Sequence, residues 1–253
     1  MTGRFVRSAL VTGAGSGIGR ACAIALAAEG FSLALLGRTS LAIEETASTI
    51  THGGGNAITL PANVADEPAV EAALATTVDH FGRLDLLFNN AGTSAPKAAL
   101  DDVELRHFER VLATNVTGAF LCARAAFRQM RAQDPQGGRI INNGSVSAHV
   151  PRPNGTPYTV SKHAITGLTR QIALDGRRYA IACSQIDIGN ADTGVAATLQ
   201  SGMEQPDGRV MPEPVMPLQS VTDAIVLMAK LPLSTNIQFM TVLATKMPFI
   251  GRG

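Results

Sequence analysis

The chain has 253 residues, of which 45% are hydrophobic and 16% are charged, and its formal net charge is +1. A chain of this length and composition can bury an ample core in one large α/β domain. The near-neutral balance argues against a nucleic-acid or membrane-surface binder, because both usually carry a basic excess.

The cysteines and histidines predict neither disulfides nor a metal site. Cys22, Cys122 and Cys183 lie far apart in apolar surroundings, and the five histidines match no metal-ligand spacing. Sparse, odd-numbered cysteines are typical of buried thiols in a reducing compartment. No stretch approaches the roughly 18 apolar residues of a membrane helix, and residues 1–10 contain no long apolar segment. We therefore expect a soluble cytoplasmic protein.

A glycine-rich turn follows the first predicted strand. The apolar residues 8–12 run directly into Gly13-Ala-Gly-Ser-Gly-Ile-Gly19, and an alanine-rich predicted helix occupies residues 20–30. Glycines let the backbone approach a pyrophosphate, and the start of a helix offers free N–H groups to phosphates. A flexible turn would have the same composition, but the order strand, glycines, helix favours phosphate binding.

The end of the second predicted strand, residues 31–36, bears on the choice of dinucleotide. An acidic residue at this point would bind the ribose 2′-hydroxyl of NAD. Here Gly37 takes that place and Arg38 follows. An arginine suits a 2′-phosphate, which it holds by charge-assisted hydrogen bonds, so the sequence favours NADP(H) over NAD(H), although a solvated loop arginine would look the same.

Strands and helices alternate along the rest of the chain. Helices are predicted at 41–50, 67–81, 101–130, from 158 onward, and at 221–229, and strands at 57–60, 84–88, 139–142, 180–188 and 237–243. This alternation predicts an α/β fold, a doubly wound parallel sheet of about seven strands with helices on both faces. No repeat or linker divides the chain, so residues 1–253 are expected to form a single domain.

Polar residues stand where the predicted strands end. Asn63 could hold the adenine through its side-chain amide or serve only as a turn residue. Asn89-Asn90-Ala91-Gly92 falls at the carboxyl end of a strand, where open parallel sheets bind ligands. Asn115 lies within a predicted helix, and an asparagine there is a poor helix former unless its side chain has a role.

Tyr158 and Lys162 are four positions apart in a predicted helix. That spacing puts both side chains on one face, about one turn apart. A fixed ammonium beside a phenol favours the phenolate, and such a tyrosine can exchange a proton with an alcohol or a carbonyl. A half-buried tyrosine beside a solvated lysine is the alternative for this common spacing.

The segment 190–217 is rich in proline, glycine and methionine. We expect either a disordered surface loop or a mobile lid over the substrate, with soft apolar side chains. This segment and residues 147–157 would select the substrate, which the methionines suggest is moderately apolar.

Together these motifs resemble the classical short-chain dehydrogenase/reductase family over nearly the whole chain. The residues that carry the resemblance are Thr12-Gly13-x-x-x-Gly17-x-Gly19, Asn89-Asn90-Ala91-Gly92, Asn115, Ser145 and Tyr158-x-x-x-Lys162. The resemblance implies a Rossmann fold and hydride transfer between NADP(H) and a carbonyl or secondary alcohol. It also implies a homodimer or homotetramer through residues 101–130 and 157–178.

The resemblance also implies a role for each site residue. Tyr158 would be the general acid/base, and Lys162 would stabilise its phenolate and bind the nicotinamide ribose. Ser145 would hydrogen-bond the substrate oxygen, with Ser147 as the second choice, and Asn115 would hold a water that links Lys162 to solvent. Cofactor contacts would come from Gly13, Ser16, Gly17, Ile18, Gly19, Arg38, Asn63, Val64, Asn90, Ala91, Gly92, Tyr158, Lys162, Gly189 and Thr193.

Three departures from the family pattern stand out. Ile188 replaces a usual proline before Gly189, Asn63 stands where aspartate is common, and the usual Asp-Gly-Gly near the C-terminus is absent. These departures affect the loop around the nicotinamide, the adenine site and the tail, and none of them falls on Asn115, Ser145, Tyr158 or Lys162.

Two other functions are compatible with parts of the sequence. A catalytically silent NADP(H)-binding sensor would keep the glycine turn, but such a protein would be expected to lose Tyr158 or Lys162. A serine hydrolase could use Ser145 with His149 or His163. It is disfavoured because Ser145 is not in a Gly-x-Ser-x-Gly turn and no acid partner is evident.

Overall fold

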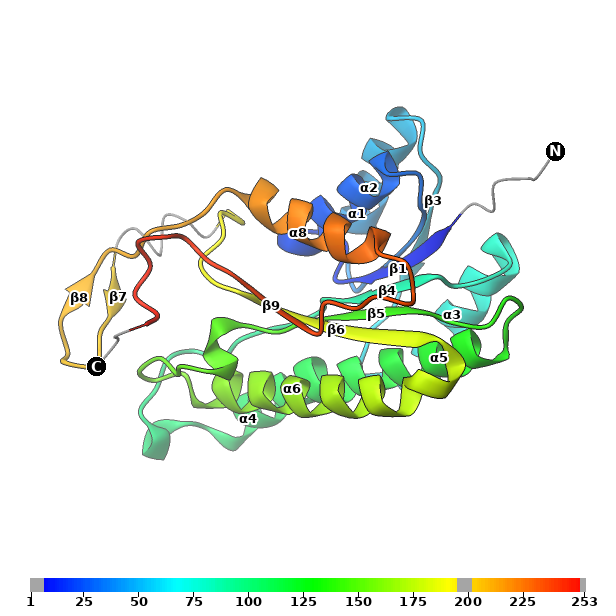
Figure 1. Ribbon diagram of the computed structural model, residues 1–253. Coiled ribbons are helices and arrows are strands. Elements are labelled where there is room, and N and C mark those ends of the chain that lie inside the picture. Colours follow the sequence, from blue (N-terminus) through cyan, green and yellow to red (C-terminus); the bar gives the residue numbers. More distant parts are fainter. Residues whose placement is uncertain (1–6, 195–201, 251–253) are drawn as a thin grey trace.

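A parallel sheet forms the centre of the molecule in the computed structural model, which describes residues 7–194 and 202–250 (Figure 1). Within these residues the sheet has seven strands in the order β3-β2-β1-β4-β5-β6-β9. The strands are β1 (Ser8–Thr12), β2 (Ser32–Gly37), β3 (Ala57–Pro61), β4 (Leu86–Asn89), β5 (Gly138–Asn143), β6 (Ile181–Ile188) and β9 (Phe239–Val242). From β1 the next strands are added toward one edge of the sheet, as far as β3, and from β4 onward they are added toward the other edge. The change falls between β1 and β4, and such a switch point creates a crevice for ligands.

Helices cover both faces of the sheet (Figure 1). One face carries α1 (Gly17–Ala28), α2 (Ser40–His52) and α8 (Leu218–Lys230), and the other carries α3 (Glu67–Phe81), α4 (Leu105–Leu112), α5 (Ala119–Ala132) and α6 (Thr156–Gly176). The expected doubly wound parallel sheet is therefore confirmed.

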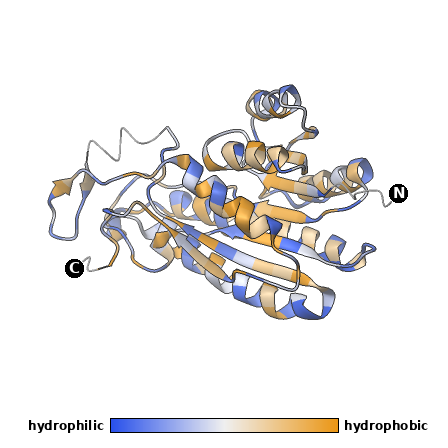
Figure 2. Ribbon diagram, turned by 45° about the horizontal axis from the view of Figure 1, so that its top comes forward, coloured by the Kyte–Doolittle hydropathy of each residue, from blue (hydrophilic) through white to orange (hydrophobic). Residues whose placement is uncertain are grey.

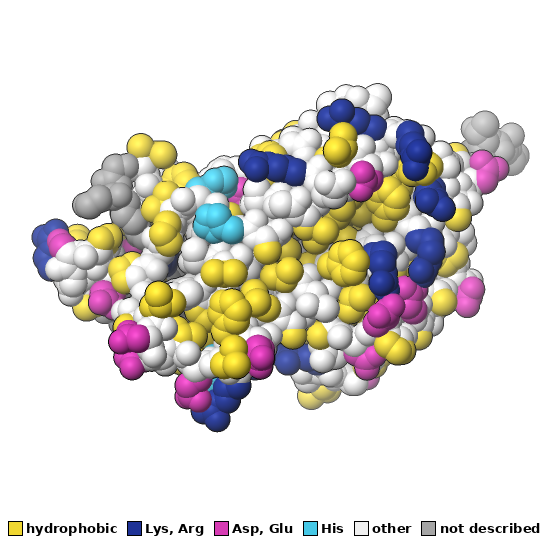
Figure 3. All heavy atoms as spheres, turned by 90° about the horizontal axis from the view of Figure 1, so that it is seen from below, with side chains coloured by type: hydrophobic (Ala, Val, Ile, Leu, Met, Phe, Trp, Pro, Cys, Tyr) yellow, Lys and Arg dark blue, Asp and Glu magenta, His cyan; other side chains and the backbone are white. Residues whose placement is uncertain are grey.

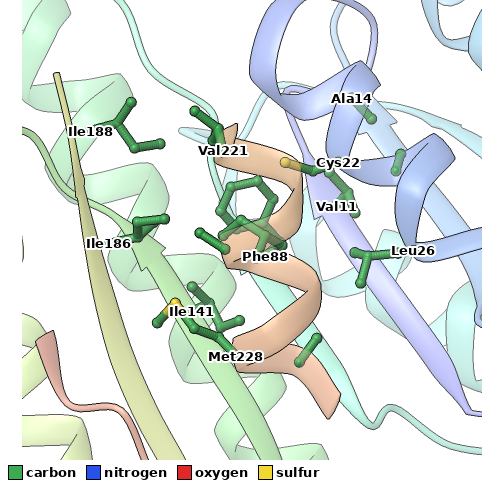
Figure 4. Packing of buried hydrophobic residues seen from close by; sticks show 14 of the residues in the cluster. Val11, Ala14, Cys22, Leu26, Phe88, Ile141, Ile186, Ile188, Val221 and Met228 are labelled. Carbon is green, nitrogen blue, oxygen red and sulfur yellow. The ribbon is translucent and has the colours of Figure 1, made fainter. Parts of the chain in front are cut away.

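Strands buried on both faces explain the apolar runs in the sequence. Along β1, Ala9 and Val11 pack on the side of α1 and α8, and Leu10 packs on the opposite side. The central strands are largely hydrophobic, whereas polar residues lie on the outer sides of the helices (Figure 2). Figure 4 shows the apolar layer between the sheet and the helices α1 and α8. The residues labelled in this layer are Val11, Ala14, Cys22, Leu26, Phe88, Ile141, Ile186, Ile188, Val221 and Met228.

Local signals set the element boundaries. Helix α3 begins after Asp66, whose carboxylate accepts the Ala69 N–H at 3.2 Å, and ends at Gly82 in the left-handed conformation (φ 80°). The helical region predicted over 101–130 is divided into α4, a π-helical turn η2 (Ala113–Gly118) and α5. Asn115 lies in that π turn, a rare element that is frequent at functional sites.

The segment 190–217 contains structure that the sequence did not reveal. A short antiparallel hairpin is formed by β7 (Met203–Glu204) and β8 (Val210–Met211). The prediction of a mobile lid falls partly on residues 195–201, which lie outside the described residues.

All three cysteines are buried, as expected, and burial raises the pKa of the thiols of Cys22, Cys122 and Cys183 to about 12. Thiols of this kind are unreactive, because the thiolate is the nucleophile. No described helix has the length and hydrophobicity needed to cross a membrane. Nor do three or more His, Cys, Asp or Glu side chains of the described residues gather where a metal could bind.

Candidate active site

The turn between β1 and α1 depends on glycine at several positions. Gly13 and Gly17 have positive φ values of 66° and 51°. At Gly19 a Cβ atom would lie 2.2 Å from the Gly13 carbonyl oxygen and 2.6 Å from Asn90 Nδ2. The first turn of α1 therefore packs directly against the backbone of the glycine turn. No side chain caps the start of α1, so its first N–H groups are available to a ligand.

A cavity of about 570 Å³ extends from this turn along the carboxyl ends of the strands. Every predicted cofactor contact except Gly189 lines it: Gly13, Ser16, Gly17, Ile18, Gly19, Arg38, Asn63, Val64, Asn90, Ala91, Gly92, Tyr158, Lys162 and Thr193. Its volume lies within the usual range of small-molecule and cofactor sites. A glycine cradle, an uncapped helix start and a long cavity fit a dinucleotide.

One end of the cavity lies beside β2 and the turn after β3. The exposed Arg38 lines it there, next to Gly37, where a Cβ would approach Ile43 Cγ2 to 2.8 Å. The side-chain oxygen of Asn63 accepts the Ala65 N–H at 3.1 Å. Asn63 is therefore a turn residue, and its amide N–H groups are left to face a ligand.

Asn90 connects the glycine turn to the rest of the sheet. Its Nδ2 donates to the Thr12 carbonyl at 2.9 Å, and its main-chain N–H donates to Thr12 Oγ1 at 2.9 Å. Its Oδ1 accepts a hydrogen bond from Asn143 Nδ2, also at 2.9 Å. These contacts join the ends of β1, β4 and β5 along the floor of the cavity.

Tyr158 and Lys162 lie one turn apart on α6 and both line the cavity. Lys162 is 5% exposed, and its Nζ donates to the Asn143 carbonyl at 2.7 Å and lies 5.5 Å from the centre of the Tyr158 ring. A buried ammonium is thus fixed one helical turn from a phenol. This pair can donate or accept a proton at the cavity wall.

Ser145 and Asn115 do not line the cavity, although Asn143, two residues before Ser145, and Thr114, beside Asn115, do. Ser145 follows β5 and is buried, and its Oγ accepts the Ser147 N–H at 3.1 Å. Since that contact uses an acceptor site of the hydroxyl, the O–H remains free to donate to another oxygen. Ser147 is also buried and lies in the 3₁₀ turn after Ser145.

Asn115 is buried beneath the cavity wall and holds Thr93, which lines the cavity. Its Oδ1 accepts the Thr93 N–H at 2.7 Å, and its Nδ2 donates to the Thr93 carbonyl at 2.9 Å and to Ser161 Oγ at 3.0 Å. The side chain therefore joins the π turn, the segment after β4, and α6.

Thr193 and Gly189, which follow β6, face different parts of the molecule. Thr193 lies close to the glycine turn, 3.6 Å from a Cβ placed on Gly17. Gly189 instead faces the C-terminal segment, since a Cβ there would lie 2.8 Å from both Leu243 Cβ and the Met247 sulfur.

Sequence reasoning missed an acidic residue beside Ser145. His149 Nε2 lies 2.7 Å from Asp187 Oδ2, so this histidine does have an acid partner. Within the described residues no hydrogen bond joins Ser145 Oγ to His149 or His163, so no nucleophile–base pair of a serine hydrolase is present. The available signal was the unexpected polarity of β6, where Ser184, Gln185 and Asp187 interrupt the apolar residues, but the sequence did not connect Asp187 with His149. Other lining residues missing from the predicted set are Gly15, Leu36, Gly37, Thr39, Ala42, Ile43, Ala62, Thr93, Ser94, Thr114 and Asn143.

The family model of the short chain dehydrogenases matches residues 7–204. The chain belongs to this family. As a member of the short chain dehydrogenase family it is an oxidoreductase. Most of the motif residues that suggested the resemblance line the cavity: Gly13, Gly17, Gly19, Asn90, Ala91, Gly92, Tyr158 and Lys162.

Individual relatives agree with the assignment. The chain is 35% identical over 212 residues to the uncharacterized oxidoreductase YohF of Escherichia coli (strain K12), which covers 83% of this chain and 81% of that protein. It is 35% identical over 232 residues to 2-(R)-hydroxypropyl-CoM dehydrogenase of Xanthobacter autotrophicus, covering 88% and 91% of the two chains. The crystal structure of NAD⁺-bound xylitol dehydrogenase superposes with a TM-score of 0.86 at 29% identity, covering 95% of this chain and 99% of that one.

Replacing Gly19 with alanine tests the tight packing of α1 on the glycine turn. The added Cβ would overlap the Gly13 carbonyl oxygen, so the backbone of the turn must move. We expect Gly19→Ala to weaken the binding of NADPH and NADH at least tenfold, an estimate of about 1.4 kcal/mol or more, measured by fluorescence titration. Gly167→Ala is the control, because a Cβ at Gly167 meets nothing within 4 Å. Unchanged affinity in Gly19→Ala would contradict this account of the turn.

Proposed function

We propose that the protein is an NADP(H)-dependent oxidoreductase that transfers a hydride between the nicotinamide and a carbonyl or secondary alcohol. Tyr158 acts as the general acid/base. The observation that carries the proposal is the position of Tyr158 and Lys162 on the wall of the cavity that the glycine turn opens. A proton-transferring pair and a dinucleotide cradle in one cavity are the two components that this reaction requires.

When bound, the cofactor supplies the hydride for reduction and accepts it in oxidation. The glycine turn and the start of α1 would hold its pyrophosphate. Thr193 and Asn90 would lie beside its nicotinamide end. Lys162, already fixed by the Asn143 carbonyl, would bind ribose hydroxyls with its remaining N–H groups.

Tyr158 and Ser145 act on the substrate oxygen. In reduction, the Tyr158 hydroxyl protonates the oxygen as hydride arrives at the carbon, and Lys162 stabilises the phenolate that forms. The free O–H of Ser145 donates a second hydrogen bond, which stabilises the negative charge that develops on the same oxygen. In oxidation the roles reverse, and the Tyr158 phenolate takes the alcohol proton.

We propose that the π turn around Asn115 helps to return a proton from solvent to Tyr158 after each reduction. Because the side chain of Asn115 is occupied by Thr93 and Ser161, the water proposed to link Lys162 with solvent would be held by the main chain of the π turn. A π turn displaces the regular pattern of main-chain hydrogen bonds and supports this assignment.

Replacing Tyr158 with phenylalanine tests the reaction class. Tyr158→Phe removes the transferred proton and leaves the ring, so kcat should fall by about 10²–10⁴-fold while the affinity for NADPH stays within about twofold. The assay follows nicotinamide absorbance over a panel of ketones and secondary alcohols. The other tyrosine of the chain gives a matched control, Tyr179→Phe, which should keep full activity. Retained turnover in Tyr158→Phe would refute the assignment. NADPH binding by the wild type without turnover of any substrate in the panel would favour a silent binding protein.

The preference for NADP(H) rests on Gly37 and Arg38. No carboxylate follows β2 to bind a ribose 2′-hydroxyl, and the Arg38 guanidinium lines the cavity. Among the similar structures, xylitol dehydrogenase contains NAD⁺, so the fold alone does not select NADP(H). The residue type at position 38 supports the phosphorylated form here.

Charge reversal at Arg38 tests this preference. Hydrogen bonds to a charged group contribute about 1.5–3 kcal/mol, so Arg38→Asp should lower kcat/KM for NADPH by about 10–100-fold and raise the relative use of NADH. Arg38→Lys keeps the positive charge without the guanidinium, so its kcat/KM for NADPH should lie between that of the wild type and that of Arg38→Asp. A wild-type preference for NADH, or an Arg38→Asp variant with an unchanged ratio, would overturn the cofactor assignment.

We further propose a homodimer or homotetramer that forms through α4, α5 and α6. Hydrophobic side chains gather on this face of the molecule (Figure 3). Leu105 (68% exposed), Phe120 (45%) and Leu174 (56%) lie on these three helices. Large exposed apolar patches of this kind mark interaction surfaces.

Substitution on this face tests the assembly. Phe120→Glu should shift the mass measured by light scattering toward that of the monomer, because a charge replaces a large apolar contact. Leu41→Glu, on α2 at the other face and 66% exposed, is the control and should leave the mass unchanged. A monomeric wild-type protein would contradict the proposed assembly.

A further inference from the structure

A buried carboxylate lies beside the segment that carries Ser145. Asp187, near the end of β6, has no solvent exposure. Its Oδ1 accepts the Ser145 main-chain N–H at 3.0 Å and Gln185 Nε2 at 2.7 Å, and its Oδ2 lies 2.7 Å from His149 Nε2. A buried carboxylate without such partners would be strongly unfavourable, so these contacts hold it in place.

The backbone around Ser145 is shaped to admit this carboxylate. At Gly144 a Cβ would lie 2.1 Å from Asp187 Oδ1 and 2.8 Å from Gln185 Nε2. Any side chain at position 144 would therefore displace Asp187 from the Ser145 N–H. Asp187 can occupy its position only because residue 144 is a glycine.

Ser145 is held at two points as a result. Its backbone is extended (φ −171°, ψ 153°), its N–H donates to Asp187, and its Oγ accepts the Ser147 N–H. The orientation of the free O–H thus depends on both contacts. A shift of about 1 Å in such a group can cost on the order of 10²-fold in rate.

We propose that Asp187 is a positioning residue that holds the Ser145 hydroxyl toward the substrate oxygen, and that His149 is its counter-charge. The inference rests on the proposed function, in which Ser145 donates to that oxygen. Asp187 acts through Ser145 and does not itself touch the reacting atoms.

The surroundings of Asp187 leave His149 as its charged partner. Gln185, its neighbour on β6, is neutral, and the same amide nitrogen also bonds Thr166 Oγ1 of α6 at 3.0 Å. The His149 side chain is 42% exposed, and its ring packs edge-on to Phe249 at 6.4 Å. Part of the His149 side chain is therefore open to solvent while its Nε2 lies against the buried carboxylate.

Two substitutions at Asp187 separate positioning from packing. Asp187→Asn keeps an oxygen for the Ser145 N–H and can donate to a neutral His149, so it should retain kcat within about threefold. Asp187→Leu has similar volume but no acceptor, so kcat should fall by about 10–100-fold. The KM for NADPH, set at the glycine turn, should stay within about twofold in both variants. Equal kcat in the wild type and Asp187→Leu would overturn the proposal.

A double-mutant cycle with Ser145 identifies the route of the effect. If Asp187 acts through the serine hydroxyl, Asp187→Leu should change kcat by less than about threefold in a Ser145→Ala background, because the group it positions is gone. A full multiplicative loss in that background would overturn the positioning role. Wild-type activity in Ser145→Ala alone would instead refute the serine's role in the proposed function.

Thermal unfolding and NADPH titration establish whether each variant is folded. If Asp187→Leu does not fold, His149→Leu takes its place in the same cycle, because its side chain is partly exposed and its loss removes only the counter-charge. It should lower kcat several-fold in the wild-type background and have no further effect in Ser145→Ala. An unaltered kcat in His149→Leu with a folded protein would refute the counter-charge role.

Discussion

The hydrogen bond from Lys162 Nζ to the Asn143 carbonyl joins α6, the helix that carries Tyr158, to the sheet. The Asn143 side chain continues to Asn90, and Asn90 continues to Thr12 at the end of β1. This series of contacts fixes the glycine turn, the floor of the cavity and the Tyr158 helix relative to one another. Hydride and proton transfer require the two reactants within a fraction of an ångström of their productive positions, so the reaction depends on this frame.

The elements that could be predicted from sequence are those whose signals are local. Apolar strands buried on both faces, such as β1 and β2, and a helix with cap residues at both ends, such as α3, need no distant partner to be recognised. The π turn at Asn115 was missed because hydrophobic spacing does not distinguish an inserted residue from a regular helix. The β7–β8 hairpin was missed because two-residue strands have no periodicity.

The same distinction applies to the site. Tyr158 and Lys162, like the glycines of the first turn, could be predicted because they belong to motifs with fixed spacing. The role of Asp187 could not, because an aspartate in a strand has meaning only once His149, 38 residues away, is known to be its partner. The change from proline to Ile188 falls directly after this aspartate. Ile188 is buried and packs in the apolar layer of α8, so the end of β6 is anchored by packing beside its polar contacts.

A second set of contacts joins the loop before α6 to the segment that follows β6 and to the hairpin. Arg152, in the loop before α6, pairs with the buried Glu213 at 2.6 Å and bonds Asn190 at 2.8 Å. Asn190 also donates to Glu213, and Asn154 donates to Glu204 of the hairpin. A buried ion pair of this kind adds little net stability but disfavours other arrangements of the segments that it joins.

The loop before α6 and the hairpin are therefore held as one unit, separate from the cofactor frame of Thr12, Asn90 and Asn143. The two sets of contacts meet between Ser145 and Tyr158, where β5 passes into α6. If the loop and the hairpin select the substrate, changes in them could alter substrate choice without moving the glycine turn, whereas a change at Asp187 would act on the backbone of Ser145. Under the proposed function, substrate choice and the geometry of the reaction would then be set by different residues.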